Sequence, residues 1–114
     1  MKDCLFCKFV DREIPTETVF ESDTVFAFND IDPKAPQHVL IIPKKHIATL
    51  NDISEKDAGI IAEMFLVAKQ IAVDRKIDGS GYRAVFNCNA DGGQEVFHLH
   101  LHLLGGRKMT WPPG

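Results

Sequence analysis

Three histidines alternate with leucines near the C-terminus, in the run His98-Leu99-His100-Leu101-His102. Successive side chains of a β-strand point to opposite faces, so a strand here would place the three imidazoles together on one face. Histidines on one face stand about 6.5 to 7 Å apart, and two of them can contact one phosphoryl group at that spacing. Neutral imidazole is a nucleophile near pH 7 and forms covalent phosphoryl-type intermediates. The row therefore predicts a site for phosphoryl chemistry centred on His100.

Two other roles of this row stay open at the level of the residues. The histidines could cover the polar face of an exposed strand, although three of the chain's five histidines fall within five residues. Alternate imidazoles on one strand can also ligate zinc. The preceding Gly92-Gly93 pair suits an anion-binding turn of backbone amides and equally suits a plain hairpin turn.

A pair of cysteines, Cys4 and Cys7, has the spacing of metal and redox motifs. The third cysteine, Cys88, lies on a predicted strand, where we expect a small core or pocket residue. Three cysteines in this arrangement do not form the framework of a disulfide-rich protein. We therefore expect reduced thiols, with Cys4 and Cys7 as candidate metal ligands.

The composition indicates one globular domain, residues 1–114, with 45% hydrophobic and 25% charged residues. The formal net charge is -3, whereas proteins that bind nucleic acid usually carry an excess of basic residues. We therefore expect no nucleic-acid partner. No apolar run has the length of a signal peptide or of a membrane span. The sequence predicts a cytoplasmic protein without membrane association.

The elements that must position the histidines follow from periodicity. A capping-box pattern at Ser54 begins a helix with apolar residues at helical spacing, which Asp78-Gly79 ends. Strands are predicted at 18–21, 24–28, 39–42, 82–88 and 95–103, with a turn at 89–93 and a short helical turn at 5–10. The fold class is α+β: a mostly antiparallel sheet of about five strands with one long helix and a short N-terminal helix.

The run from His98 to Leu104 resembles the His-x-His-x-His-x-x motif, with hydrophobic x, of the histidine-triad (HIT) family. Further stretches resemble the bacterial zinc-binding type of its Hint branch over essentially the whole chain: Glu13-Ile14-Pro15, Phe28-Asn29-Asp30-Ile31, Ala35-Pro36-Gln37-His38, Ile42-Pro43-Lys44-Lys45-His46, Asp91-Gly92-Gly93-Gln94 and residues 104–114. The resemblance implies a HIT-like fold and a homodimer. It also implies hydrolysis of the P–N bond of purine nucleoside 5'-phosphoramidates, such as adenosine 5'-monophosphoramidate, through a nucleotidyl-histidine intermediate.

The same resemblance implies roles for individual residues. His100 is the nucleophile, His102 a phosphate ligand, and His38 a histidine near the leaving group. Asp30 matches the residue that binds the ribose hydroxyls. The purine pocket is matched by four apolar residues, for which filling the core is an equally good explanation: Leu5, Phe6, Phe9 and Ile31. The surroundings of the α-phosphate are matched by Asn87, Gly93, Glu95 and Val96, together with His100 and His102.

The positions that match the family's zinc ligands are Cys4, Cys7, His46 and His98. Two thiolates and two imidazoles suit a closed structural zinc site. This set leaves His98 outside the chemistry. A catalytic zinc on His100 and His102 is disfavoured, because a ligating imidazole has no lone pair free to attack. No organic cofactor is expected.

One departure from the family concerns Glu95, which stands where many members have serine. A carboxylate there would repel an ionised phosphate, attract a cationic amine leaving group, or act as a protonated donor. Two alternative functions stay open. A dinucleoside polyphosphate hydrolase shares the histidine row but is disfavoured by the ending from Gly105 to Gly114. A nucleotide-binding regulatory protein with incidental catalysis is compatible with every residue.

Overall fold

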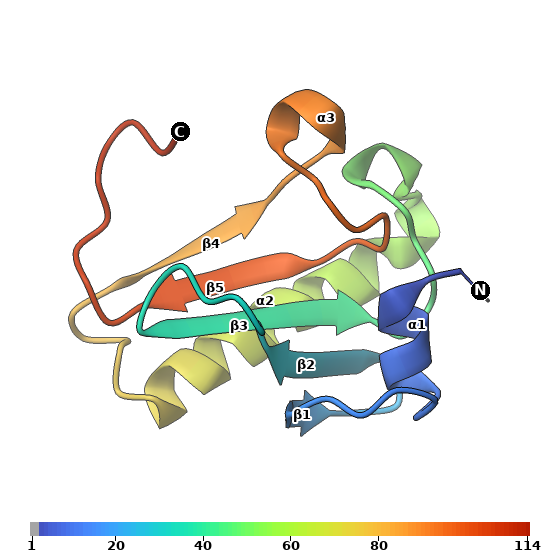
Figure 1. The fold of residues 1–114 in the computed structure, drawn as a ribbon, viewed down its shortest axis with the longest axis horizontal. Coiled ribbons are helices and arrows are strands. Elements are labelled where there is room, and N and C mark those ends of the chain that lie inside the picture. Colours follow the sequence, from blue (N-terminus) through green and yellow to red (C-terminus); the bar gives the residue numbers. More distant parts are fainter. Residues whose placement is uncertain (1–2) are drawn as a thin grey trace.

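A five-stranded antiparallel sheet forms the centre of the computed structural model, which describes residues 3–114 (Figure 1). Its strands are β1 (Thr18–Glu21), β2 (Val25–Asn29), β3 (Gln37–Pro43), β4 (Tyr82–Phe86) and β5 (Leu101–Gly105). They lie in the order β1-β2-β3-β5-β4, and every neighbouring pair is antiparallel. The predicted α+β class is confirmed.

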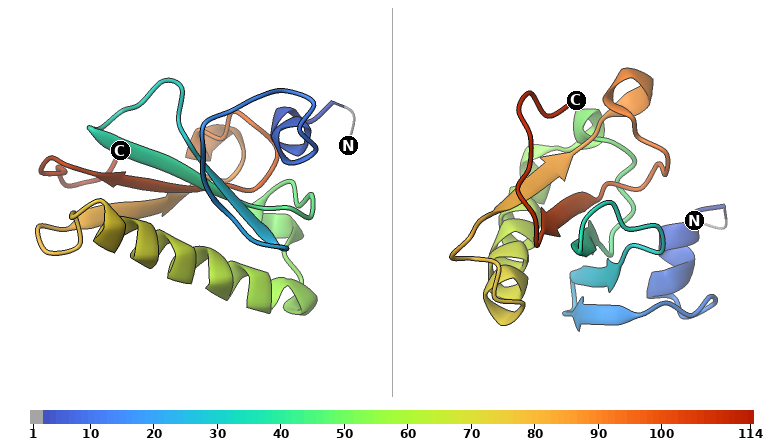
Figure 2. Two further views of the ribbon diagram at one scale, coloured as in Figure 1. Left: turned by 90° about the horizontal axis from the view of Figure 1, so that it is seen from below. Right: turned by 60° about the vertical axis from the view of Figure 1, so that its left-hand side comes forward.

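The long helix α2 (Ala58–Asp74) covers one face of the sheet (Figure 2). A 3-10 turn, Glu55–Asp57, precedes it, and the Ser54 amide donates to Asp57 Oδ2 at 2.9 Å, which confirms the predicted capping box. Apolar side chains of α2 pack against the inward side chains of the strands, among them Val25, Ala27, Val39, Ile41, Leu101 and Leu103. The leucines of the row thus face the helix, as predicted. Within residues 3–114, no helix combines the length and apolar character needed to cross a membrane.

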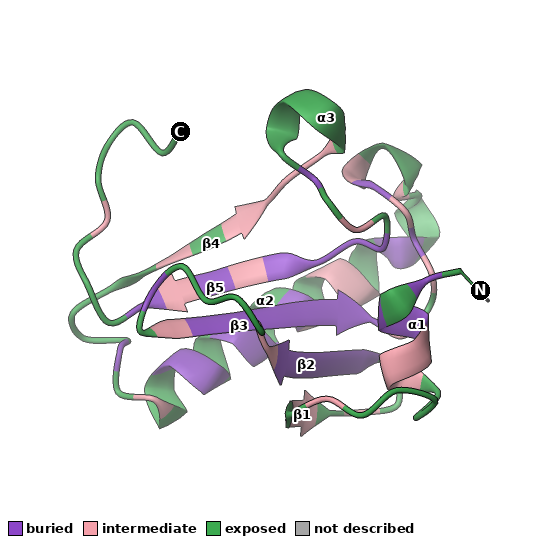
Figure 3. Cartoon of the chain, viewed as in Figure 1, coloured by how far each residue is buried: buried purple, intermediate pink, exposed green. Residues whose placement is uncertain are grey.

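The short helix α1 (Leu5–Val10) lies on the opposite face, at the end of the sheet where β2 begins and β3 ends (Figures 1 and 2). It packs Cys4, Phe6 and Cys7 against a second apolar cluster that includes Phe26, Phe28, Leu40 and Ile42. Strands β2 and β3 are therefore buried on both faces (Figure 3). Burial on both faces explains their nearly continuous apolar runs.

The last strand is present, but its predicted bounds, 95–103, are wrong. β5 begins at Leu101, so His98 and His100 lie in the irregular segment that leads into it. The pairing between β3 and β5 stops at Ile41 opposite Leu101. Two residues further along β3, Pro43 has no amide hydrogen to continue the ladder.

The segment between β4 and β5 also differs from the prediction. β4 ends at Phe86 instead of residue 88, and the expected turn contains a short helix, α3 (Asn89–Gly92). Gly93 caps this helix with φ at 82°, a left-handed conformation that favours glycine. The glycine pair therefore ends a helix, and its interpretation as a plain hairpin turn is wrong.

Candidate functional site

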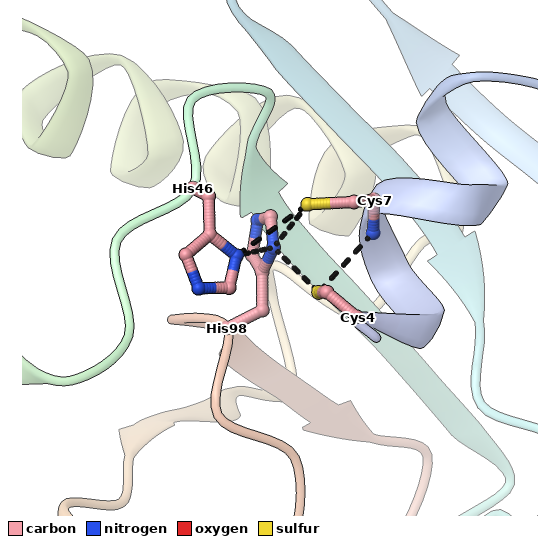
Figure 4. Close-up of side chains that lie close together, drawn as sticks. All are labelled: Cys4, Cys7, His46 and His98. Atoms are coloured by element: carbon pink, nitrogen blue, oxygen red, sulfur yellow. Dashed lines mark hydrogen bonds between the residues drawn. The ribbon is translucent and has the colours of Figure 1, made fainter. Parts of the chain in front are cut away.

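Four candidate metal ligands meet at the N-terminal end of α1 (Figure 4). Cys4 and Cys7 come from the first turn of α1, His46 from the segment after β3, and His98 from the segment before β5. The Nδ1 atom of His98 lies 3.2 Å from Cys4 Sγ, 3.5 Å from Cys7 Sγ and 3.2 Å from His46 Nδ1. Cys7 Sγ lies 3.4 Å from His46 Nδ1. These four residues form a group that could hold a metal ion.

The distances between the ligand atoms fit a tetrahedral zinc ion. Zn–S and Zn–N bonds of ordinary length place two nitrogens about 3.3 Å apart and a sulfur and a nitrogen about 3.6 Å apart. The Nε2–H of His98 donates to the Pro43 carbonyl at 2.8 Å, which leaves the lone pair on Nδ1, facing the cluster. Ligating histidines are usually oriented by this kind of hydrogen bond. The donor set, the spacing and the ring orientation therefore agree.

Burial shifts the protonation of the cluster's thiol and imidazole groups toward their neutral forms. Burial, together with the neighbouring Cys4, raises the pKa of the Cys7 thiol to about 11. Burial lowers the pKa of His98 to about 4, which keeps this ring in the neutral form that binds metals. A metal ion would stabilise the thiolates against the effect of burial.

A second group consists of His38 on β3, His102 on β5 and Asp30, which follows β2. The backbone amide of Lys34 donates to His38 Nδ1 at 3.0 Å, so the proton of a neutral His38 is on Nε2. That nitrogen lies 2.9 Å from His102 Nδ1 and 3.4 Å from Asp30 Oδ2. His38 therefore donates to His102 Nδ1, and the proton of His102 is on its Nε2. This Nε2 is buried and has no protein partner among residues 3–114, so its proton is free for a ligand.

The hydrogen bond from Lys34 argues against a metal ion in this second group, although Asp30, His38 and His102 lie close enough to hold one. A metal on His38 Nε2 would need a lone pair where the ring carries its proton. Metal-ligating histidines instead donate through their other nitrogen. The two histidine groups are thus chemically different.

His100 has the opposite protonation pattern from His102. Its Nδ1 lies 2.7 Å from the carbonyl oxygen of His98, so Nδ1 carries the proton and Nε2 keeps its lone pair. Burial lowers the pKa of His100, against the opposing charges of Asp30 and Glu95. The rings of His100 and His102 lie 4.9 Å apart, which places an unprotonated nitrogen beside a histidine with a free N–H.

The interpretation of the row as the polar face of an exposed strand is wrong, because His98 and His100 are 0% and 8% exposed. Their burial depends on α1, whose Phe6 ring lies 5.2 Å from the His100 ring and 6.0 Å from the His98 ring.

The predicted purine-pocket residues fall into two sets. Phe6 is buried, and Phe9 packs against it and against Phe28. Leu5 and Ile31 are 42% and 100% exposed, so they do not fill the core. The alternative that these four residues serve the core therefore holds for the phenylalanines and fails for the other two.

The residues predicted around the α-phosphate lie on the segment between β4 and His98. Asn87 and Gly93 flank α3, Val96 packs against the cluster around Phe6, and Glu95 is exposed. Gln94 holds this segment in place, because its amide group bonds to the carbonyls of Ala48 and Val96 and to the amide of Asn89.

Sequence reasoning missed the backbone groups that orient the rings, namely the Lys34 amide and the Pro43 carbonyl. No pattern of residue types reports such partners. The family motif could have indicated that the surrounding loops matter, but it could not identify the atoms.

Comparison with known proteins identifies the family. The family model described as "HIT domain" matches residues 11–109. The chain belongs to the HIT family. A solved HIT family hydrolase from Legionella pneumophila is 56% identical, with a TM-score of 0.97, and the match covers 98% of this chain and 100% of that one.

Two curated relatives of this HIT protein are similar over almost their whole length. A purine nucleoside phosphoramidase of Escherichia coli is 46% identical over 108 residues, which cover 95% of this chain and 91% of the relative. An uncharacterised HIT-like protein of Synechocystis is 47% identical over 113 residues, which cover 99% of this chain and 98% of the relative. The similarity to members of the HIT family therefore extends over almost the whole chain.

The protonation of His102 predicts a pH dependence of stability. Burial lowers the pKa of His102 to about 4, whereas an unfolded histidine titrates near 6.5. Between these values the unfolded chain binds more protons, so the free energy of unfolding falls as the pH is lowered from 6.5 to 4. Urea unfolding at fixed zinc concentration measures this effect. Between pH 7 and pH 4, the free energy of unfolding should fall by about 2 kcal/mol more in wild type than in His102→Asn. This difference is smaller than the full linkage energy because solvent screens part of the ring. Equal losses in both proteins would contradict the assigned protonation.

Proposed function

We propose that this HIT family hydrolase cleaves the P–N bond of purine nucleoside 5'-phosphoramidates. The observation that carries the proposal is the pair of neighbouring imidazoles with complementary protonation, His100 with a free Nε2 lone pair and His102 with a free Nε2–H. The similarity to the Escherichia coli purine nucleoside phosphoramidase supports this substrate class.

In the proposed reaction, His100 Nε2 attacks the α-phosphorus of the substrate while the Nε2–H of His102 donates to a phosphate oxygen. The new N–P bond replaces the P–N bond of the substrate, and the amine leaves after its nitrogen takes up a proton from solvent. Water then hydrolyses the nucleotidyl-His100, which yields the nucleoside monophosphate and restores the imidazole. His38 keeps His102 in the donating form and lies near the leaving group.

The remaining predicted residues would bind the nucleotide. Asp30, beside His38, would hold the ribose hydroxyls. The purine would lie among Leu5, Phe6, Phe9 and Ile31, and the contact of Phe6 with the His100 ring supports this placement next to the nucleophile. The α-phosphate would be surrounded by Asn87, Gly93, Glu95 and Val96.

Replacement of the nucleophile tests the reaction. His100→Ala should lower the kcat for adenosine 5'-monophosphoramidate by about 1,000-fold or more, because it removes the unprotonated Nε2 beside His102. Its Kd for adenosine monophosphate should stay within a few-fold of wild type in calorimetric titration. Hydrolysis near the wild-type rate would disprove the assignment of the nucleophile. A wild-type protein that cleaves a diadenosine polyphosphate faster than the phosphoramidate would instead disprove the substrate class.

We propose zinc as the metal of the Cys4, Cys7, His46 and His98 group, because two sulfurs and two imidazole nitrogens at tetrahedral spacing suit this ion. Protein purified without chelator should contain about one zinc ion per chain by elemental analysis. Cys7→Ser should lower this content, whereas Cys88→Ser, outside the group, should retain it. Wild-type protein without zinc would contradict the proposal.

We also propose a homodimer, in which the free edge of β4 meets the β4 of a second copy. β4 is the last strand of the sheet order, so one side of its backbone has no neighbouring strand among residues 3–114. Large apolar side chains are exposed on β4 and on the outer side of α2: Tyr82, Phe65, Leu66 and Val73. An unpaired strand edge beside an apolar surface is a typical site of association.

Sedimentation equilibrium tests the dimer. Wild-type protein should have the mass of two chains, and Leu66→Glu should shift it toward one, because a charge would be buried in the interface. Ile14→Glu replaces an exposed apolar residue near β1 and should leave the mass unchanged. A wild-type mass of one chain at micromolar concentration would refute the dimer.

A further inference from the structure

His98 takes part both in the candidate metal cluster and in the orientation of His100. Its ring faces Cys4, Cys7 and His46, while its backbone carbonyl oxygen accepts the hydrogen bond from His100 Nδ1 at 2.7 Å. The side chain of one residue is thus part of the metal centre, and its peptide group sets the protonation of the neighbouring nucleophile.

The backbone around His98 depends on few anchors, because it precedes β5 and lies outside the sheet ladder. The Leu99 amide donates to the carbonyl of Ile47 at 2.6 Å. The His98 ring donates to the Pro43 carbonyl and turns its Nδ1 toward the metal ligands. Since Ile47 directly follows the ligand His46, two of these anchors converge on the metal cluster.

A second connection runs through α1. Cys4 and Cys7 hold its first turn at the cluster, and Phe6 lies between them in the sequence. The Phe6 ring meets the His100 ring edge-on, at 88° and a centroid distance of 5.2 Å. The cluster therefore fixes both the carbonyl that orients His100 and the aromatic ring that packs against it.

Two of the four candidate metal ligands, Cys7 and His46, border a hollow at the surface. A hollow of about 170 Å³ is lined by Cys7, Val10, Asp11, Lys44 and His46. His46 is partly exposed, and the carboxylate of Asp11 supplies a negative charge beside two of the ligands.

We propose that a divalent metal ion at Cys4, Cys7, His46 and His98 positions His100 through the carbonyl of His98, so that hydrolysis depends on metal occupancy. The inference rests on the proposed role of His100 as nucleophile. Loss of the ion leaves the His98 ring held by its hydrogen bond to the Pro43 carbonyl alone. The ring then shifts, the adjoining peptide group rotates, and His100 Nδ1 loses its acceptor. The ring proton then exchanges between Nδ1 and Nε2, and the fraction of His100 with a free Nε2 lone pair falls. His98 is in this sense a positioning residue.

NMR of protein labelled with ¹⁵N-histidine tests the coupling without relying on activity. Two-bond nitrogen–proton couplings distinguish the two neutral forms of an imidazole. In zinc-loaded protein, His100 should show the Nδ1–H form alone, and removal of zinc with a chelator should produce an average of both forms. His38 and His102, whose protonation depends on the Lys34 amide, should keep their patterns and serve as the internal control. The kcat should fall by about 10- to 100-fold on zinc removal and recover when zinc is returned.

Two variants of matched chemistry complete the test. Cys7→Ser should reproduce the metal-free pattern, and Cys88→Ser should match wild type. If circular dichroism shows that Cys7→Ser is unfolded, the chelator experiment on wild type decides. An unchanged His100 pattern after proven loss of zinc would overturn the proposal, whether or not kcat falls. A His100 pattern that responds to zinc in a protein without phosphoramidate hydrolysis would support the coupling and contradict the proposed function.

Discussion

Hydrogen bonds from the backbone determine which ring nitrogen of each histidine carries its proton. The Pro43 carbonyl accepts from His98 Nε2, the His98 carbonyl accepts from His100 Nδ1, and the Lys34 amide donates to His38 Nδ1. Each assignment excludes one role and permits another, since a nitrogen that carries a proton can neither ligate a metal nor attack phosphorus. His98 is left with a lone pair toward the cysteines, His100 with a lone pair toward its neighbour His102, and His102 with a free N–H. Three histidines in one sequence motif thereby differ in the lone pair or N–H that each can offer to a ligand.

The sheet makes this arrangement possible because both of its faces are buried. On one face, α2 covers the alternate side chains of β2, β3 and β5 with an apolar core. On the other face, α1 packs on the aromatic residues of β2, and its Phe6 ring lies against the buried rings of His98 and His100. Burial lowers the pKa values of His98 and His102 to about 4, so the rings stay neutral at physiological pH. Their reactivity and their ligand properties therefore depend on the same packing that stabilises the fold.

Much of this architecture could be predicted from the sequence, and the failures have physical causes. The alternation of histidine and leucine predicted which side chains share a face, and burial of Leu101 and Leu103 confirms it. Alternation alone could not show that β5 begins only at Leu101. The ladder between β3 and β5 ends there because Pro43, on β3, has no amide hydrogen to donate. The grouping of Cys4 and Cys7 with His46 and His98 came from the family resemblance, since ligands so far apart in the chain leave no local pattern. The cytoplasmic location and the absence of nucleic-acid partners stay predictions of the sequence.

The account depends most directly on the covalent step at His100. Rapid quenching of the reaction with adenosine 5'-monophosphoramidate, followed by proteolysis under alkaline conditions and mass spectrometry, would identify the modified residue. We expect an adenylyl group on the peptide that contains His100, and fragmentation should place it on that residue while substrate is being turned over. An adenylyl group on His38 or His102, or rapid turnover with no labelled peptide, would contradict the division of roles among the histidines.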